Sequence, residues 1–408
     1  MLDAAAPADI AAVKLGAVAQ INPRLDARLD PDEVVPFVPM AAVSAVTAGI
    51  EAEETRPYAE VSKGYTAFRD GDVLVAKITP CFENNKIAHA RLSGPVGFGS
   101  TEFHVIRADP HRLDPRYVLH FLRQDHVRAE GERKMTGSAG QRRVPAQVLA
   151  DLSLPLPPLD EQRRIAGILD EAGALRAKRQ AALAQLDEMA RAIFLETVGD
   201  PLTNPNGFDH GNIETMVADA KRDVRCGPFG TQLKVGEIVD EGIPLLGIEN
   251  VLNDRFVPSS RKFLTAEKAK QLAAFDVQAG DVLVTRMGTI GRACVVPADF
   301  VGGRFSYHLF RIRPDQGRCL PKFLVSTIVY SGSFQEQLAK LAHGAIMDGL
   351  STGDLKAVRF LLPPFAIQER LNAQFAELEA ARGHATAAAQ QLDSLFAALQ
   401  HRAFRGEL

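Results

Sequence analysis

The fold of this chain is decided by a stretch that occurs twice. The first copy reads LPPLDEQRRIAGILDEAGALRAKRQAALAQLDEMARAIF at residues 156–194, and the second reads LPPFAIQERLNAQFAELEAARGHATAAAQQLDSLFAALQ at residues 362–400. Both copies are rich in Ala, Leu, Glu, Gln and Arg, which favour helices. Each begins with two prolines, which end the preceding structure and allow a helix to start. The sequence therefore predicts two long helices.

Apolar residues follow alternating steps of three and four along each copy, the pattern of a coiled-coil seam. The predicted seam includes Ile165, Ile168, Leu175, Leu186, Met189 and Ile193, and then Leu371, Leu378, Leu392, Leu395 and Leu399. It would extend over roughly 43 Å of each helix. A seam this long would be prone to aggregate if exposed. We expect the helices to pair as an intramolecular antiparallel coiled coil; the alternative is two separate helices, each lying on its own domain.

The duplication extends beyond the helices. Gly71–Val75 returns as Gly280–Val284, and the helical copies lie 206 residues apart. A repeat of this length indicates two similar halves. We predict globular domains at residues 1–155 and 201–360, with helical spacers at 156–200 and 361–408.

Each predicted domain mixes strands with helices. Short apolar runs separated by Gly and Pro, such as residues 72–78 and 282–286, are typical of strands. Helices are expected near 116–128 and 322–340. The predicted fold class is α+β, with two α/β domains separated by the long helices.

Composition excludes several classes of protein. The 408 residues are 46% hydrophobic and 24% charged, which is typical of a globular chain. No run of 18 apolar residues predicts a membrane span, and the N-terminal sequence lacks the pattern of a secretory signal. The four cysteines lie far apart and form no C-x-x-C pair, so we expect reduced thiols and no zinc site. The net charge of −3 gives no argument for nucleic-acid binding from total charge.

The sequence contains no complete motif of the enzyme classes that act on DNA or hydrolyse ATP. A phosphate-binding G-x-x-x-x-G-K-[ST] loop is absent. Asn204-Pro205 lacks the second proline and the aromatic residue of an adenine-methyltransferase element, and Glu132-Arg133-Lys134 is a chance match to a nuclease motif. We therefore predict no catalytic residues and no metal ligands in this chain.

Basic and amide side chains near strand ends are the candidates for DNA contact, because such groups match base edges and phosphates. The candidates are Lys77, Thr79, Asn84, Asn85, Lys86, Arg142, Arg143, Lys221, Arg222, Arg225, Arg286, Thr289 and Arg292. A plain hairpin turn is the alternative for residues 286–292. A linker is the alternative around residues 137–143, and a solvated mixed surface is the alternative for each basic cluster.

The order of motifs resembles the specificity subunit of Type I restriction–modification systems. Leu156–Gln162 is similar to the start of that family's central conserved helix, and Arg402–Leu408 is similar to its usual C-terminus. Motifs similar to the family's recognition domain occur at residues 38–40, 63–65, 72–74, 76–81, 85–88 and 97–103, and in the second half at 227–230, 242–244, 280–283 and 288–292.

The resemblance implies a non-catalytic, cytoplasmic subunit. Each recognition domain would read one half of a split double-stranded DNA site, while the coiled coil would set the gap and dock two methyltransferase subunits. Motor-nuclease subunits would join the complex. The chain would bind no cofactor; its partners would use S-adenosylmethionine, ATP and Mg. Because the two halves differ outside the shared motifs, we expect an asymmetric site. The alternative function is a coiled-coil protein scaffold without DNA specificity.

Overall fold

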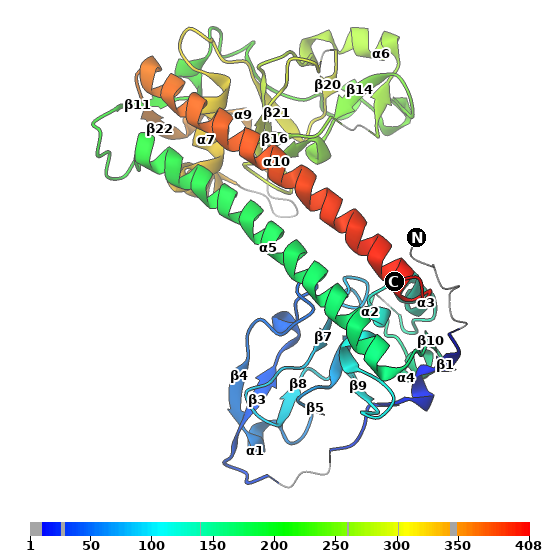
Figure 1. Ribbon diagram of the computed structural model, residues 1–408. Helices are drawn as coiled ribbons and strands as arrows, with labels where there is room; N and C mark the ends of the chain where they lie inside the picture. The colour runs from blue at the N-terminus through cyan, green and yellow to red at the C-terminus, as the bar shows by residue number, and fades with distance from the viewer. Residues whose placement is uncertain (1–9, 26–28, 139, 259–260, 301, 343–348) are drawn as a thin grey trace, which may run out of the picture. The chain divides into compact units, whose positions relative to one another are not determined.

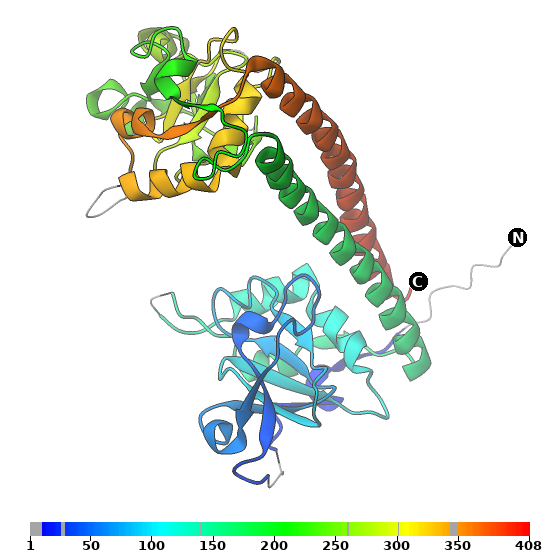
Figure 2. The ribbon, with the colours of Figure 1, turned by 90° about the vertical axis from the view of Figure 1, so that its left-hand side faces the viewer.

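The computed structural model describes residues 10–25, 29–138, 140–258, 261–300, 302–342 and 349–408. The chain divides into two units: unit 1 contains Met1–Ala182 and Ala385–Leu408, and unit 2 contains Leu183–His384. Two continuous helices, α5 (Leu159–Thr197, green) and α10 (Phe365–Ala403, orange to red), each contribute to both units (Figures 1 and 2). The fold is therefore mixed α and β with two long helices, as predicted.

Unit 1 contains two four-stranded sheets. The first has the order β2-β9-β6-β7 and the second has the order β4-β3-β8-β5, with β3 and β8 parallel. The strands of this unit are β1 (Ala12–Lys14), β2 (Ala19–Ile21), β3 (Val34–Val38), β4 (Glu54–Pro57), β5 (Thr66–Arg69), β6 (Val73–Ala76), β7 (Ile87–His89), β8 (Val96–Gly99), β9 (Phe103–Ala108) and β10 (Ser153–Pro155). Its short helices are α1 (Tyr58–Val61), α2 (Pro115–Leu122), α3 (Asp125–Arg133) and α4 (Ala146–Ala150).

Unit 2 repeats this plan. Its sheets have the orders β12-β21-β18-β19 and β13-β17-β14-β20, again with a parallel pair, β14 and β20. The strands are β11 (Asp209–Asn212), β12 (Val224–Cys226), β13 (Ile238–Val239), β14 (Ile243–Leu246), β15 (Val251–Leu252), β16 (Arg255–Phe256), β17 (Phe263–Leu264), β18 (Val282–Thr285), β19 (Ala293–Val295), β20 (Arg304–Phe305), β21 (Leu309–Ile312) and β22 (Arg359–Leu362). The helices are α6 (Ala266–Gln271), α7 (Pro321–Tyr330), α8 (Gly332–Leu341) and α9 (Thr352–Ala357).

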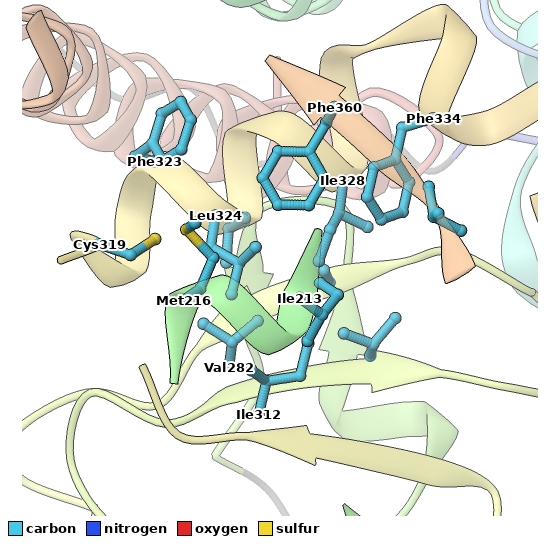
Figure 3. Packing of buried hydrophobic residues seen from close by; sticks show 14 of the residues in the cluster. Ile213, Met216, Val282, Ile312, Cys319, Phe323, Leu324, Ile328, Phe334 and Phe360 are labelled. Atoms are coloured by element: carbon cyan, nitrogen blue, oxygen red, sulfur yellow. The ribbon is translucent and has the colours of Figure 1, made fainter. Parts of the chain in front are cut away.

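The central strands, β6 and β18, form because their residues, apart from Thr285, are apolar and are buried on both faces. All four residues of β6 and all four of β18 are buried. Each strand follows a glycine with positive φ, Gly71 at 87° and Gly280 at 82°, a backbone conformation that suits glycine at a turn. In unit 2, Val282 packs with Ile213, Met216 and Phe323 in the core that Figure 3 shows. The sheet that contains β6 in unit 1 and the sheet that contains β18 in unit 2 thus have equivalent buried inner strands.

The single helices expected near 116–128 and 322–340 are each broken in two. In unit 1 the break occurs at Gln124, whose backbone is extended between α2 and α3. In unit 2 it occurs at Ser331, whose hydroxyl accepts a hydrogen bond from the Phe334 N–H and caps α8. Capping by a side-chain oxygen satisfies a backbone donor that the new helix would otherwise leave unpaired. The prediction of one helix was wrong in both places.

The long helices run antiparallel where they pair. In unit 1, the Nε of Arg176 donates to Asp393 at 2.6 Å, and Arg164 donates to the carbonyl of Leu408 at 2.7 Å. In unit 2, Arg382 forms an ion pair with Asp187, and Thr197 donates to Gln374 at 3.2 Å. In both units the residue numbers rise on α5 as they fall on α10, which defines antiparallel pairing.

The predicted seam is correct at every seventh residue and wrong at three of the listed positions between them. Ile165 and Leu371 are 1% exposed, and Leu378 is 7% exposed. Leu186, Ile193, Leu392 and Leu399 are partly buried, as is Ile168. Leu175 and Leu395, however, are 54% exposed, and Met189 is 50% exposed.

The inward-facing residues in these intervals lie one position later. Leu169 and Ala190 on α5 are fully buried, and Phe375 on α10 is 1% exposed. Arg176, one position after Leu175, reaches the other helix through Asp393 and lies over the Phe396 ring. The steps are therefore four then three, where the prediction had three then four. Small and long-stemmed polar residues occupy the pairing face, so apolar character alone misled the assignment.

Candidate nucleic-acid interface

The candidate residues of the two halves gather at equivalent strand ends. Lys77 follows β6 and Arg286 follows β18, the corresponding strand of unit 2. The backbone N–H of Lys77 donates to Glu102, and its carbonyl accepts from Val144, both at 2.9 Å. Arg286 makes the same pair of bonds, to His308 at 3.0 Å and from Leu350 at 3.1 Å. The repeat thus presents one basic side chain at the same position in each unit.

Lys77 lines a pocket of about 470 Å³ in unit 1. The pocket combines a second cation, Arg24, with polar and aromatic side chains that include Asn22, Ser62, Tyr58 and Phe98. Cations, hydrogen-bonding groups and aromatic faces are the groups that contact phosphates and bases. This is the part of unit 1 whose chemistry best suits nucleic acid.

Most other candidates on this loop are held by carboxylates. The Thr79 hydroxyl donates to Glu83 at 2.8 Å, and Arg142 lies 3.8 Å from the same carboxylate. Arg143 forms a bidentate pair with Glu102, at 3.0 Å from Nε and 2.8 Å from Nη2. The hydrogen bond from Arg143 lowers the pKa of Glu102 below its ordinary value. These interactions order the loop, and they compete with any phosphate for the arginines.

Asn85 and Lys86 point into the fold. Asn85 adopts a φ of 58°, and its side-chain amide donates to the carbonyl of Arg123 at 3.4 Å. The Nζ of Lys86 donates to the carbonyl of Met40 at 3.0 Å. Backbone carbonyls inside unit 1 thus accept hydrogen bonds from both side chains, and the predicted role of these residues in DNA contact stays a prediction. Asn84, between the loop's buried residues, is exposed.

In unit 2, Arg286 lies against aromatic rings. Its Nε donates to the carbonyl of Leu350 at 2.8 Å, and its guanidinium lies 5.0 Å from the centre of the Phe229 ring. Phe229 is 51% exposed and Tyr307 is 41% exposed, with their ring centres 6.3 Å apart. Exposed aromatic rings beside a cation offer stacking surfaces for bases.

Sequence reasoning missed Phe229 and Tyr307 as interface residues. The first lies in the quoted motif Gly227–Gly230, which was the available signal. Tyr307 had no comparable signal, because β21 and the turn before it bring it to Phe229 only in the tertiary fold.

Thr289 and Arg292 form the hairpin turn that was the alternative to DNA contact. Gly288 and Gly291 have φ of 71° and 81°. The Arg292 N–H donates to the Thr285 hydroxyl at 3.0 Å, and the Thr289 hydroxyl is buried without a hydrogen-bond partner within the described chain. The positive φ of Gly291 is a backbone conformation that L side chains rarely adopt, so the turn favours glycine there. Thr289, Arg292 and the two glycines therefore determine the shape of the turn, and Arg286 lies at its start.

The remaining basic cluster of unit 2 is partly paired. Arg222 forms a bidentate pair with Asp223, at 2.9 Å from Nε and 3.2 Å from Nη2. The hydrogen bond from Arg222 lowers the pKa of Asp223. The Nε of Arg225 donates to the carbonyl of Arg222 at 3.3 Å, while Lys221 is exposed. Lys221 is thus the member of this cluster most accessible to a phosphate.

Within the parts of the chain that the structure describes, no three His, Cys, Asp or Glu side chains gather as a metal site. None of the described helices is long and apolar enough to cross a membrane.

Comparison with known proteins gives a family match in the first half of the chain. A family model described as the Type I restriction modification DNA specificity domain matches residues 7–185. The specificity subunits of the Type I restriction enzymes EcoEI and EcoAI of Escherichia coli are similar to it. They are 43% identical over 156 residues and 41% identical over 149 residues. These alignments cover 38% and 36% of this chain, but only 26% and 25% of the relatives, so the match spans about a quarter of their length.

The alignments that cover more of the chain have lower sequence identity. The StySPI specificity subunit of Salmonella potsdam is 25% identical over 349 residues, which cover 79% of this chain and 71% of that protein. A solved chain from a study of complex assembly in the type I R-M system has a TM-score of 0.55 at 20% identity, covering 97% of this chain and 98% of its own. The S subunit from M. genitalium has a TM-score of 0.50 at 14% identity, covering 99% and 97%. These two likenesses establish a shared fold along nearly the whole chain.

Proposed function

We propose that this chain is a DNA sequence-specificity subunit, because its residues 7–185 match the family model described as the Type I restriction modification DNA specificity domain. Each unit would read one half of an asymmetric, bipartite double-stranded site. The single observation that carries the proposal is the repetition of the matched domain's sheet order in unit 2, with Lys77 and Arg286 at equivalent strand ends. Two similar readers on one chain suit a split site.

The asymmetry of the site rests on the different surroundings of these two cations. Lys77 lies in a pocket with Arg24 and Asn22, whereas Arg286 lies against Phe229 and the carbonyl of Tyr307. Different donors and rings at the same position would select different bases. The two half-sites are therefore expected to differ in sequence.

The long helices are proposed to set the gap between the half-sites and to dock partners. Leu175 and Met189 on α5, and Leu395 on α10, expose half or more of their surface although they are large and apolar. Apolar side chains exposed along a helix favour helix-to-helix docking. We propose two methyltransferase subunits as the partners there, with motor-nuclease subunits joining the complex. S-adenosylmethionine, ATP and Mg would belong to those partners, and this chain would perform no chemistry in the cell's cytoplasm.

Selection of bound duplexes from a random DNA pool tests the proposal. The chain would be co-expressed with its methyltransferase partner, and the selection carried out at one stated salt concentration, because affinity for DNA depends on salt. Two short, unlike half-sites at one fixed gap are expected. An intact complex that shows no sequence preference would favour the scaffold alternative, and identical half-sites would contradict the proposed asymmetry.

A further inference from the structure

A second pocket of unit 1 carries an unusual concentration of positive charge. It has a volume of about 470 Å³ and lies between residues 46–50, α2, α5 and the last turns of α10. Four arginines line it, together with two histidines and a single carboxylate: Arg91, Arg116, Arg123, Arg176, His89, His120 and Asp170. None of these residues belongs to the interface described above.

Two histidine nitrogens in this pocket lack partners. His120 is 5% exposed, and its Nε2 lies 2.8 Å from Asp170, so that nitrogen carries the proton and donates it to the carboxylate. Its Nδ1 is buried and has no hydrogen-bond partner within the described residues, and the same holds for the Nε2 of His89. Both histidines line the pocket, and buried polar atoms are nearly always hydrogen-bonded, so two unpartnered nitrogens beside one pocket mark its wall as unusually polar.

The arginines divide into paired and unpaired charges. Arg116 donates to Asp170 at 3.1 Å, and Arg176 donates to Asp393 at 2.6 Å. Arg123 is held only by carbonyls, including that of Ala45 at 2.6 Å, and burial lowers its pKa to about 10, so it stays charged at neutral pH. Arg91 is exposed and forms no ion pair with any residue that the structure describes. Arg91 and Arg123 thus leave positive charge uncompensated.

Unit 2 provides an internal control. Its equivalent pocket, of about 540 Å³, places Lys322 where unit 1 has Arg116 and Ala376 where unit 1 has Asp170. There Lys322 lies 2.8 Å from Asp254 and also pairs with Glu379. The two cations that line that pocket, Lys322 and Arg255, are balanced by its two carboxylates, Asp254 and Glu379. The repeat fold therefore does not require the excess positive charge of unit 1.

We propose that the pocket of unit 1 binds a small phosphate-bearing anion. Arginine guanidinium groups match the geometry of phosphate oxygens, and the pocket volume is in the range of small-ligand sites. Arg91 and Arg116 would approach the anion from the loop and from α2, and Arg123 would contribute its charge. The free anion and a mononucleotide share this chemistry, and the experiment separates them.

Isothermal titration calorimetry tests the proposal. The full chain is titrated with inorganic phosphate and, separately, with adenosine 5′-monophosphate. Saturable binding at one site is expected, weakened at least tenfold in Arg91→Gln. Arg91 is exposed, so this variant is expected to keep the wild-type melting temperature. Arg163→Gln, which changes an exposed arginine on the first turn of α5, is the control and is expected to bind as the wild type does. Binding of the nucleotide but not of phosphate would identify a mononucleotide as the ligand.

The side-chain resonances of His120 give an independent readout. The anion is expected to shift the Nδ1 signal of His120, while His104 in the same unit stays unchanged because partners occupy both of its ring nitrogens. The proposal is overturned if neither anion binds, if Arg91→Gln binds as tightly as the wild type, or if a short DNA duplex alone shifts His120. Because phosphate binding is measured without DNA, failure here leaves the proposed DNA specificity untouched.

Discussion

At the scale of single residues, two glutamines explain the repeated Leu-Pro-Pro motif. The Nε2 of Gln162 donates to Pro157 at 2.8 Å and to Arg112 at 2.9 Å, and its Oε1 accepts from the Asp114 N–H at 2.9 Å. Gln368, 206 residues later, repeats the bond to the proline carbonyl at 3.1 Å and accepts from the Leu320 N–H at 3.0 Å. Each glutamine ties the start of a long helix to the chain that leads into α2 or α7.

Replacing Gln162 tests this role. Gln162→Leu leaves one backbone N–H and two carbonyls without their partner in a buried site, and unpaired buried groups cost about 1–3 kcal/mol each. We expect the free energy of unfolding to fall by about 2–4 kcal/mol, since some of these groups can relax. Urea unfolding followed by circular dichroism measures the change. Gln180→Leu, at an exposed position of the same helix, is the matched control and should leave the midpoint nearly unchanged.

His104 makes the stability of unit 1 depend on pH. Burial lowers its pKa below the ordinary value of 6.5, although its hydrogen bond to the Val144 carbonyl opposes this. The unfolded state therefore binds a proton more readily, and stability is lost as pH falls below 6.5 toward the folded pKa. We expect the melting temperature to drop less between pH 7.5 and 5.5 in His104→Gln than in the wild type. An equal drop in both would contradict the assignment, and His401→Gln, an exposed site, provides the control.

The two equivalent cations are expected to act on separate half-sites. Lys77→Gln should relax the sequence preference of the half-site read by unit 1 and leave the other half-site unchanged. Arg286→Lys should do the reverse, since lysine keeps the charge but loses the two-pronged geometry. Each lost base contact is expected to cost about 1–3 kcal/mol of discrimination. Duplex selection with each variant measures this, and loss of both half-sites in either variant would argue for a general folding defect.

At the scale of secondary-structure elements, the pairing face of the long helices is the informative feature. Leu169 is fully buried among residues of unit 1 that include Ile165 and Ala166, whereas Leu175 on the same helix is 54% exposed. The same residue type thus occupies two different environments within two turns. This contrast separates the observed pairing face from the predicted seam.

Alanine substitutions distinguish the two faces. Leu169→Ala should lower the free energy of unfolding by about 2–5 kcal/mol, because it removes buried methyl groups and leaves a cavity. Leu175→Ala should change it by less than about 0.5 kcal/mol in the isolated chain. If urea unfolding shows equal losses of unfolding free energy for the two variants, the predicted seam, with Leu175 facing inward, would be supported instead. If the methyltransferase docks on the exposed face, Leu175→Ala should instead weaken co-purification of that partner.

At the scale of the whole molecule, the duplication and the length of the helices carry the functional proposal. A matched heptad inserted into α5 after Ala182 and into α10 after His384 adds about 10.5 Å to each helix. If the helices set the gap between half-sites, the gap should increase by about three base pairs, at 3.4 Å each. Duplex selection with the lengthened chain measures the gap. An unchanged gap would show that the helices do not determine the spacing, and a heptad added to only one helix serves as the mismatched control.

Features that depend on local pattern could be predicted from the amino-acid sequence alone. Helix-forming composition after Pro157-Pro158 and Pro363-Pro364 predicted both long helices, and the return of Gly71–Val75 at residues 280–284 predicted equivalent central strands. Every seventh position of the seam was also correct, because a seven-residue repeat keeps one face of a helix in register. The resemblance to specificity subunits depended on the order of such motifs.

Which residues between those positions face inward, and which candidate side chains are free, depended on the three-dimensional fold. Ala190 is buried and Met189 is exposed because the surrounding chain covers one and leaves the other, and burial of this kind depends on neighbours distant in sequence. For the same reason, sequence pattern did not predict that Lys86 donates to the Met40 carbonyl or that Tyr307 lies beside Phe229. Nor did it predict that arginines of α2 and α5 line one pocket. Periodicity is a local property, whereas partners for charges and polar groups are supplied by the fold.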